Sequence, residues 1–508
     1  MEFNVQTLST DAVRQIAGGE VAVESAVSDA ESGGIQKILT VAADARVLSA
    51  EAVNGVAEVT GRVNFKLAYT DKNGEPGSID YFNDFTDRLE TGESSGNIYA
   101  TVAVTDADAT LNGGAVLTAV VSIKVYTIDK ENLSCLTEAD EACYTEKGTL
   151  ALSRYVTSVR HTVDLNDQIE TGTSVDKILL FDNSAVITDI NVGVENMLVS
   201  GEAVSVITYT ADGKIVSEQL IMPFSEEIAA PSLAMGQKAY GCATVKQAKI
   251  ILSGVEGGNV IRAELGVELE IRVFACEEQQ FVSDIFSTEC ELEKTMASLN
   301  VKLPLGSASF KRKVTGQVSL DSDMPAVREV IAVAGASNNV ASVVINGISD
   351  TENDKLNITI EGIVNACILY SDENGLNSVN AEIPYSETFA LSGDMKNATS
   401  VTACGIVCDA EARARRDKEI EFSAKLVITA DAGESKCVNV IGAIAEGEKK
   451  TVNDCTLSIY VAEEGDGIWD AAKALCARPD SILSQNPAVV FPLKGGEKIK
   501  FMRKAAVL

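Results

Sequence analysis

The side chains that most often carry out catalysis are scarce in this sequence. His161 is its one histidine, so histidine-containing catalytic triads and most transition-metal sites lack their usual groups. No glycine-rich phosphate loop follows a strand pattern, which disfavours nucleotide binding. We predict a structural role for His161, no enzymatic activity, no cofactor and no metal. One alternative stays open, a hydrolase whose carboxylate pair is brought together between domains, because a sequence does not reveal such a pair.

Eleven cysteines are scattered along the chain, mostly in apolar runs. An odd number without regular spacing is typical of reduced, buried thiols and not of a disulfide framework. The closest pair, Cys404 and Cys408, lacks two further ligands nearby, so packing is a better interpretation than a metal site. The N-terminal residues show no basic stretch followed by an apolar core. These features predict a cytoplasmic protein.

The longest uncharged stretch covers residues 330–349. Its three asparagines would be costly in hydrocarbon, so we predict no transmembrane segment. Within this stretch, Ser337-Asn338-Asn339 predicts a turn between two apolar strands.

Length and charge narrow the choice of fold and partners. The chain has 508 residues, and 74 acidic side chains against 42 basic ones give a net charge of −32. Such a surface repels phosphate backbones and anionic lipid, so neither nucleic acid nor a membrane surface is an expected partner. The hydrophobic fraction of 46% is too high for a disordered chain. At roughly 150 residues per domain, the length predicts about three or four domains.

Apolar and polar residues alternate along much of the chain, which is the pattern of half-buried β-strands. Residues 61–69 run from a glycine to a tyrosine in this pattern and continue into Asn73-Gly74, a turn signal whose residues tolerate positive φ. This unit predicts a β-hairpin, and it returns twice. The three Gly-x7-Tyr segments are 61–69, 201–209 and 362–370.

Each hairpin also contains a similar tetrad with an aromatic residue. The tetrads are Asp84-Phe85-Thr86-Asp87, Pro223-Phe224-Ser225-Glu226 and Pro384-Tyr385-Ser386-Glu387. The repeats have the size of domains, so we expect each copy to bury its own core. We predict three tandem antiparallel β domains, sandwich-like, over residues 1–146, 147–290 and 291–447. Extra residues in the third copy fall around 350–354.

The Gly-x7-Tyr hairpin, its Asn/Asp-Gly turn and the Pro-Phe/Tyr-Ser-Glu tetrad resemble the SPOCS domain family, which occurs in proteins of endospore-forming bacteria. The resemblance covers roughly residues 15–445. The first copy departs from it, because Asp84 stands where the other two copies have proline. The rival interpretation is a generic tandem array of β-sandwiches with similar hairpins.

The pattern changes after a short polar linker predicted at 446–450. A strand at 456–461 is followed by apolar residues at three- and four-residue steps, the spacing of a helix, from Ile468 to Cys476. Asp466 is placed to cap the free N–H groups of this helix. A second short helix starts at Pro479, and a closing strand covers 497–501. This order predicts a compact βααβ unit within residues 456–505.

The βααβ order and its glycine-rich turns resemble a LysM domain. The resemblance implies that the loop after the first strand and the loop before the last form a binding surface. The predicted partner-binding residues are Gly465, Asp466, Gly467, Ile468, Asn486, Pro487, Lys494 and Lys498. Trp469 is either a binding aromatic or, as its helical spacing favours, part of the unit's core. The family usually has Thr or Ser where this chain has Gly467 and Pro where it has Gly495, which puts glycan binding in doubt.

Three SPOCS-like domains followed by a LysM-like domain resemble the spore-coat morphogenetic proteins of clostridia. The resemblance implies a non-enzymatic adaptor in the mother-cell cytoplasm, at the outer surface of the forespore. Its LysM-like end is then expected to bind a coat morphogenetic ATPase of the SpoIVA type and so to tether coat components. The alternative is a cell-wall protein whose LysM-like domain binds peptidoglycan, a polymer that contains N-acetyl sugars.

Basic residues gather at the C-terminal end, where residues 494–504 hold five of them against one glutamate. A basic end on an acidic chain could steer an acidic partner to it. The simpler interpretation is a lysine-rich edge strand that its charges keep soluble. We hypothesise that Lys498 and Lys500 contribute to docking of a partner.

Overall fold

The computed structural model describes residues 1–28, 34–92, 98–112, 114–253, 259–322, 324–348, 354–450 and 457–503. Within these ranges the protein is mainly β, with six three-stranded sheets and one two-stranded sheet. Neighbouring strands run antiparallel in all of them. The predicted antiparallel β class is therefore confirmed. Among the described helices, none has the length and apolar character needed to cross a membrane.

The long strands fall into three sets of six with the same connectivity. In each set the first, last and fifth strands form one sheet with the last strand in its centre, and the second to fourth strands form another in chain order. The first set is β1 (Phe3–Ser28), β2 (Ile35–Val53), β3 (Val56–Asp71), β4 (Pro76–Glu90), β5 (Ile98–Leu111) and β6 (Gly114–Ala139). The second set is β7 (Cys143–Glu170), β8 (Val175–Val192), β9 (Asn196–Ala211), β10 (Lys214–Ala229), β11 (Lys238–Ser253) and β12 (Val260–Ser287). The third set is β13 (Cys290–Ser319), β14 (Glu329–Ile348), β15 (Leu356–Asp372), β16 (Gly375–Leu391), the 3-10 helix η1 (Gly393–Asn397), β17 (Ser400–Arg416) and β18 (Glu419–Lys449).

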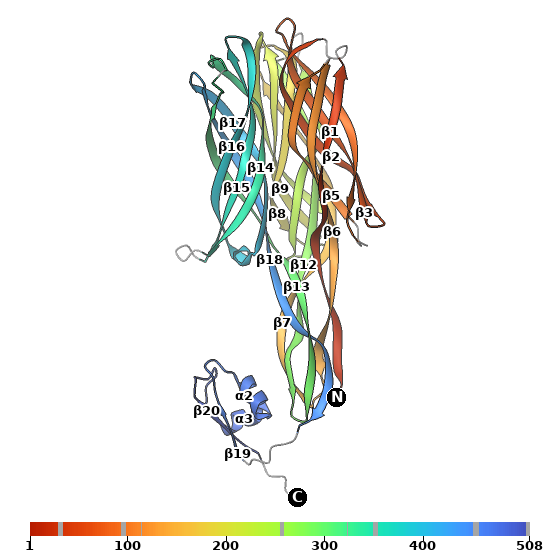
Figure 1. The fold of residues 1–508 in the computed structure, drawn as a ribbon, viewed down its shortest axis with the longest axis vertical. Helices are drawn as coiled ribbons and strands as arrows, with labels where there is room; N and C mark the ends of the chain where they lie inside the picture. Colours follow the sequence, from red (N-terminus) through yellow and green to blue (C-terminus); the bar gives the residue numbers. More distant parts are fainter. Residues whose placement is uncertain are drawn as a thin grey trace.

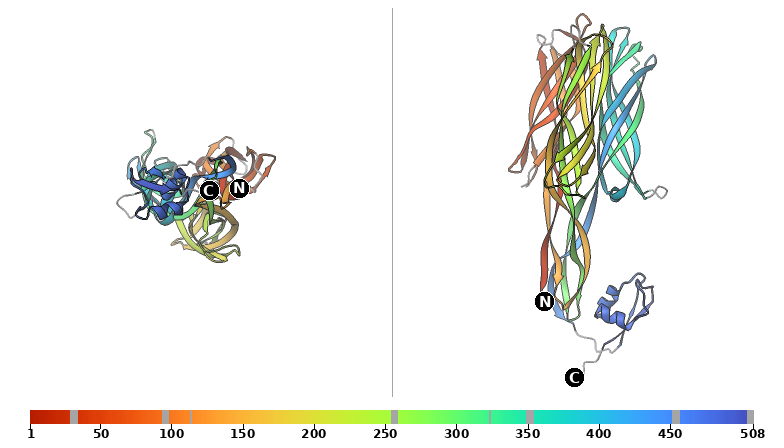
Figure 2. Two further views of the ribbon diagram at one scale, coloured as in Figure 1. Left: turned by 90° about the horizontal axis from the view of Figure 1, so that it is seen from below. Right: turned by 180° about the vertical axis from the view of Figure 1, so that it is seen from behind.

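The two sheets of each set pack face to face around a hydrophobic core. In the first set, fully buried Phe65 from one sheet and Leu117 from the other belong to the same cluster. In the second set, Ile207 from one sheet and Ile261 from the other likewise belong to one cluster. Alternate side chains of each strand point into the core, as expected for a sheet with one buried face. The three sandwiches lie side by side and form the head of the molecule (Figure 1; Figure 2, left).

The repeated glycine and aromatic residue of the hairpins form one packing unit. The two positions lie directly opposite each other on paired strands in all three sets, as Gly61–Phe85, Gly201–Phe224 and Gly362–Tyr385. A Cβ atom at Gly201 would lie 2.2 Å from Cζ of Phe224 and 2.4 Å from the carbonyl oxygen of Val186. The aromatic ring therefore occupies the space that a side chain would fill, and this is why the motif needs glycine.

Replacing Gly201 by alanine is expected to lower the free energy of unfolding by about 1–3 kcal/mol, because the added methyl group overlaps a ring and a backbone carbonyl. Urea unfolding followed by circular dichroism measures this change. Gly172→Ala is the matched control, since no atom lies within 4 Å of a Cβ built there. Equal stability of the two variants would contradict this account of the motif.

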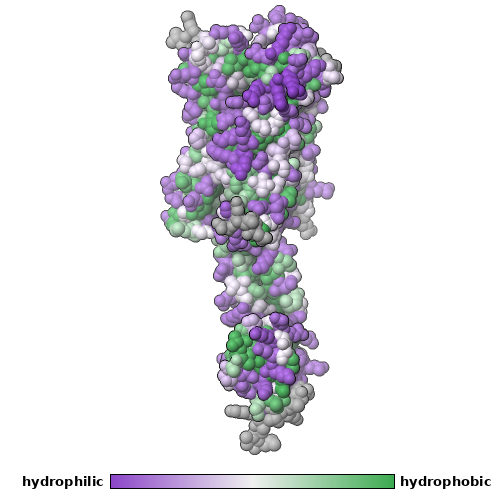
Figure 3. Space-filling model, turned by 90° about the vertical axis from the view of Figure 1, so that its left-hand side faces the viewer, coloured by the Kyte–Doolittle hydropathy of each residue, from purple (hydrophilic) through white to green (hydrophobic). Residues whose placement is uncertain are grey.

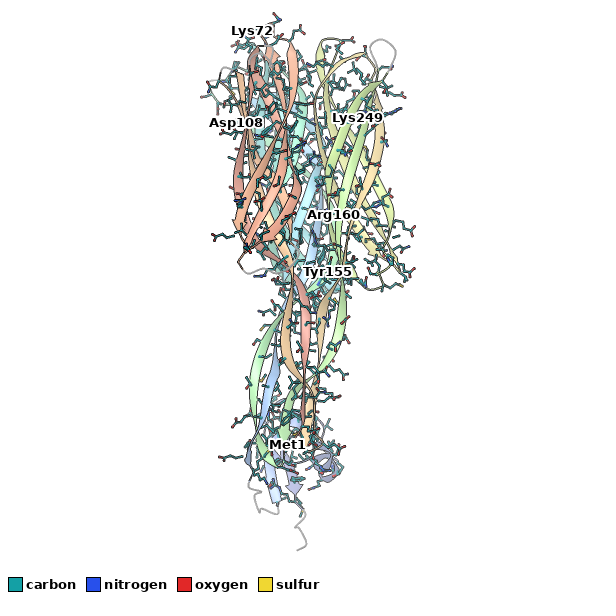
Figure 4. All side chains as sticks on the ribbon, turned by 90° about the vertical axis from the view of Figure 1, so that its right-hand side faces the viewer. Met1, Lys72, Asp108, Tyr155, Arg160 and Lys249 are labelled. Atoms are coloured by element: carbon teal, nitrogen blue, oxygen red, sulfur yellow. The ribbon has the colours of Figure 1, made fainter. Side chains whose placement is uncertain are left out.

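A stalk extends from the head, built from the outer ends of six long strands. Beyond the last partner residues of β5, β11 and β17, the remaining strands pair only two by two. The resulting ribbons join residues 3–13 to 128–139, 143–154 to 275–287, and 290–303 to 434–449. The ribbons run together to a tip where Met1 lies, and Lys72 marks the opposite end of the head (Figure 4).

Hydrophobic side chains of all three sets meet inside the stalk. One cluster combines Leu8, Leu152 and Val301, each 6% exposed or less. A further cluster nearer the tip joins Leu136, Val282 and Ile441. Each set thus has a hydrophobic cluster of its own, but the three sets also share clusters in the stalk, so they are not independent units.

Two local predictions are wrong. The predicted turn at 337–339 lies inside the continuous strand β14, with Asn338 opposite Val364. Tyr385 donates a hydrogen bond of 2.8 Å to Oδ1 of Asn338, so this side-chain oxygen has a partner inside the strand. The predicted linker at 446–450 mostly continues β18, with Glu446 opposite Leu292. The extra residues predicted around 350–354 fall between β14 and β15, and of these positions only residue 354 is among the described residues.

The last described part, residues 457–503, is called the module below. It contains β19 (Leu457–Val461), α2 (Ile468–Leu475), α3 (Pro479–Gln485) and β20 (Lys498–Met502). Strands β19 and β20 pair antiparallel, with Ile459 opposite Lys500. The predicted residue 456 and residues 504–505 lie outside the described ranges. The module lies beside the tip of the stalk (Figure 1).

Candidate partner-binding site

The two loops predicted to bind a partner lie side by side in the module. Gly465 donates a backbone hydrogen bond of 2.9 Å to Leu493, and Leu493 donates one of 2.8 Å to Asp466. Gly496 likewise donates to Ala462 over 2.8 Å. Gly465 has a φ of 97°, which favours glycine at this sharp turn. The structure thus brings residues 462–467 and 493–497 together as one surface.

Asp466 does not cap the following helix, contrary to the prediction. Its Oδ2 accepts hydrogen bonds of 2.5 Å from the hydroxyl of Tyr460 and 2.6 Å from the N–H of Glu463. The bond to Asp466 raises the pKa of Tyr460 to about 12. The residue before helix α2 is Gly467, and its N–H donates to Asp470 over 2.8 Å. Asp466 therefore shapes the loop, and Asp470 stabilises the helix start.

Asn486 is occupied by bonds within the module. Its amide nitrogen donates to the carbonyl groups of Ile482 and Lys500, and its Oδ1 accepts from the N–H of Lys500. The neighbouring Gln485 makes the same kind of bonds with the backbone of Met502. These amides cover the outer edge of β20, so Asn486 has a structural task in addition to its predicted one.

The remaining predicted residues differ in exposure. Gly465, Pro487, Lys494 and Lys498 are exposed, whereas Gly467 and Ile468 are half-buried. Ile468 packs against the module's core. Lys498 lies on β20 opposite Val461, on the face of the sheet away from buried Ile499. The exposed members are those that a partner could reach without a change in the module.

Trp469 connects the module to the stalk. Its ring meets that of Phe286 edge to face, with centroids 5.0 Å apart, and also packs against the module's core. Its Nε1–H donates to Oδ2 of Asp284 over 2.9 Å. Phe286 and Asp284 both belong to β12, in the second set of strands. The tryptophan is therefore a contact between two parts of the chain as well as a core residue.

Asp284 is the centre of this contact. Nζ of Lys473 on α2 lies 2.6 Å from its Oδ2, and Lys294 on β13 binds its Oδ1. Burial alone would raise the pKa of Asp284, but the hydrogen bonds from Lys294, Lys473 and Trp469 outweigh burial and hold this pKa far below its usual range. The carboxylate stays ionised at neutral pH and holds helix α2 on the stalk.

A cavity of about 740 Å³ lies in the head between the three sandwiches. Lys66 lines it, donates to the carbonyl oxygen of Phe181 over 3.2 Å and lies over the Phe181 ring. Burial lowers the pKa of Lys66 to about 8, against the attraction of Asp80, Asp44 and Asp182. Burial also raises the pKa of Asp182.

The cavity residues were not predicted, although the repeats contain a signal for one of them. Lys66 stands five residues after the motif glycine, where the other copies have Val206 and Cys367. A lysine at a position that is apolar in the sister repeats marks a special environment. The three carboxylates near it compensate its charge, so the described geometry is explained by packing of the head.

Elsewhere, His161 lies half-buried in β7 opposite Leu269.

Within the described ranges, no three Cys, His, Asp or Glu side chains gather as metal ligands would. Cys404 and Cys408 lie on the same strand, β17, and both are free thiols. In comparisons with known proteins, no protein-family model, no curated protein and no solved structure matches the chain.

Proposed function

We propose that this chain is a non-enzymatic adaptor in spore-coat assembly, similar to the clostridial coat morphogenetic protein SipL. In this proposal residues 1–146, 147–290 and 291–447 are three SPOCS-like domains, and residues 456–505 are a LysM-like domain. The protein would act in the mother-cell cytoplasm at the forespore surface. Its module would bind a coat ATPase of the SpoIVA type.

The main support for the proposal is that the head and the module differ in charge and lie at different positions along an elongated molecule. The acidic head and the module lie far apart, with the shared-core stalk between them (Figure 1). The module residues 457–503 carry six acidic and six basic side chains, so the net charge of −32 comes from the rest of the chain. A stalk that separates a head and a module of different surface charge can hold two different partner proteins at a defined distance.

Affinity capture from sporulating cells of an endospore former tests the proposal. The full chain is expected to retain a coat ATPase, and a chain that ends at Lys450 is expected to lose it, because the module would be absent. The shorter chain keeps β18 and every strand of the stalk, so its head serves as the internal control. Equal retention by both chains would place the partner site elsewhere.

Binding to insoluble peptidoglycan distinguishes the cell-wall alternative. Retention of the full chain that free N-acetyl sugars compete away, and that is lost when the chain ends at Lys450, would favour a glycan-binding function. We expect no such retention, because Gly467 and Gly495 provide no side-chain hydroxyl or ring at the surface of the two loops.

A further inference from the structure

The two-stranded sheet of the module presents an apolar face to solvent. Leu457, Ile459 and Val461 on β19 are 49%, 51% and 56% exposed, and Met502 on β20 is 59% exposed. Lys498 and Lys500 are the other outward residues of β20. These six side chains are called the outer sheet face below. None of them is acidic.

The outer sheet face is directed away from the rest of the protein. The opposite side of the sheet, with Ile499 and Phe501, packs on the helices. Helix α2 in turn contacts the stalk through Trp469 and Lys473. The strands of the module lie on its side remote from the stalk in both front and back views (Figure 1; Figure 2, right). Figure 3 looks onto that side, where hydrophobic and hydrophilic residues lie next to one another.

Only one edge of this small sheet is open to a further strand. The side-chain amides of Gln485 and Asn486 occupy the backbone groups of β20 on its outer edge. In the part of the chain that the structure describes, β19 pairs with β20 alone. Soluble proteins usually protect such an edge with charges, proline or a bulge. Strand β19 instead carries aliphatic residues at every second position.

We propose that the open edge of β19 and the outer sheet face bind an extended, acidic segment of a partner protein by strand addition. This inference rests on the proposed adaptor function and gives the chemistry of the partner. An added strand would direct every second side chain to the outer sheet face, and some of these outward positions would carry apolar residues that pack beside Leu457, Ile459 and Val461. Other outward positions of the same strand would carry glutamate or aspartate, which would meet Lys498 and Lys500 on that face. Neither lysine makes an ion pair among the described residues.

Charge decides between an acidic partner and a second copy of the chain. Pairing of β19 with β19 of another copy would match the aliphatic rows, but it would leave all four lysines without counter-charges. An acidic strand satisfies both the aliphatic row and the lysines, so it is the occupant that the face fits best.

The test uses the full chain and a fluorescent synthetic peptide of about nine residues in which every second position is threonine and the positions between alternate valine with glutamate, so that valine and glutamate share one face. We expect binding by fluorescence anisotropy, slower hydrogen exchange of the β19 amides on binding, and weaker affinity at high salt. The same peptide with lysine in place of glutamate is expected not to bind. Ile459→Asp and the double variant Lys498→Glu/Lys500→Glu are each expected to lower affinity by about tenfold or more.

Matched controls carry the same changes on the head, away from the module. Lys72→Glu/Lys249→Glu reverses two lysines on the head (Figure 4), and Val53→Asp replaces a residue that is 62% exposed there. Both are expected to bind the peptide as the unmodified chain does. Unchanged fluorescence of Trp469 in every variant shows that the module remains folded and docked.

Three results would overturn the proposal. They are equal binding of the two peptides, unchanged affinity of both module variants, and a wild-type dimer in light scattering that Ile459→Asp converts to a monomer. The last would assign the face to a second copy of the chain. If the peptide test fails while the chain ending at Lys450 still loses its coat partner, the adaptor function stands and only this surface is wrong.

Discussion

Replacing Asp284 by alanine is expected to release the module from the stalk. The substitution removes the acceptor of Trp469 Nε1–H and the counter-charge of Lys473. Because the Asp284 side chain is 25% exposed, water screens part of the interaction, and we expect a loss of about 2 kcal/mol in docking free energy, roughly thirtyfold in the docking equilibrium. Trp469 is the sole tryptophan, so its emission reports the change directly, with a shift to longer wavelength on release.

The same contact has a predictable dependence on pH. The pKa of Asp284 is held far below its usual range in the folded protein, so its contribution is fully present above the ordinary carboxyl pKa of about 4 and is lost as pH falls further. Trp469 emission is therefore expected to stay constant from pH 8 to about 5 and to change only in stronger acid.

Asp394→Ala is the control for the Asp284 prediction, because Asp394 forms an exposed pair with Lys238 over 3.0 Å and does not contact the module. It is expected to leave Trp469 emission unchanged. Wild-type emission in Asp284→Ala would show that hydrophobic packing on Phe286 is enough to hold the module in place.

Replacing Lys66 by methionine is expected to change how stability depends on pH. The folded-state pKa of Lys66 is about 8 against an ordinary value of 10.5, so between these values the unfolded chain binds more protons than the folded one. Stability contributed by this group therefore rises as pH increases from about 8 to 10.5, by up to roughly 3 kcal/mol. Lys66→Met lacks this rise.

Urea unfolding at a series of pH values measures the difference between the two proteins. Subtracting the Lys66→Met profile from the wild-type profile removes contributions from titrating groups that do not interact with Lys66. Lys72→Met, at an exposed turn position, is expected to follow the wild type throughout. Parallel profiles of wild type and Lys66→Met would mean that Lys66 keeps an ordinary pKa.

The hairpins could be predicted because their signals are local. Alternating residues define a strand face, and Gly74 and Gly213, both with positive φ, permit the sharp turns that the sequence indicates. The repeated glycines were visible as a motif, but their reason was not. Each glycine is needed because an aromatic ring on the paired strand fills the space beside it. This can be recognised only when the register between the two strands is known.

The candidate site was predictable only in part. The adjacency of the loops around Gly465 and Lys494 was expected only from the resemblance to a LysM domain. The contact of Trp469 with Asp284 joins residues 185 positions apart, and no periodicity indicates such a pairing. Similarly, nothing local distinguishes the exposed Ile459 from a core residue, because alternation gives two faces and does not say which one is buried.

The sequence by itself determined the antiparallel β character, the threefold repetition and the change of pattern after residue 450. These depend on residue types at short spacing, which act through backbone preferences and burial of one strand face. Tertiary structure alone decided that the three repeats share a stalk, that Lys66 lies in a cavity, and that the module docks by helix α2 with its apolar sheet face outward. Each of these depends on which surfaces meet over long distances in the chain, and that is set by the packing of complete sheets against one another.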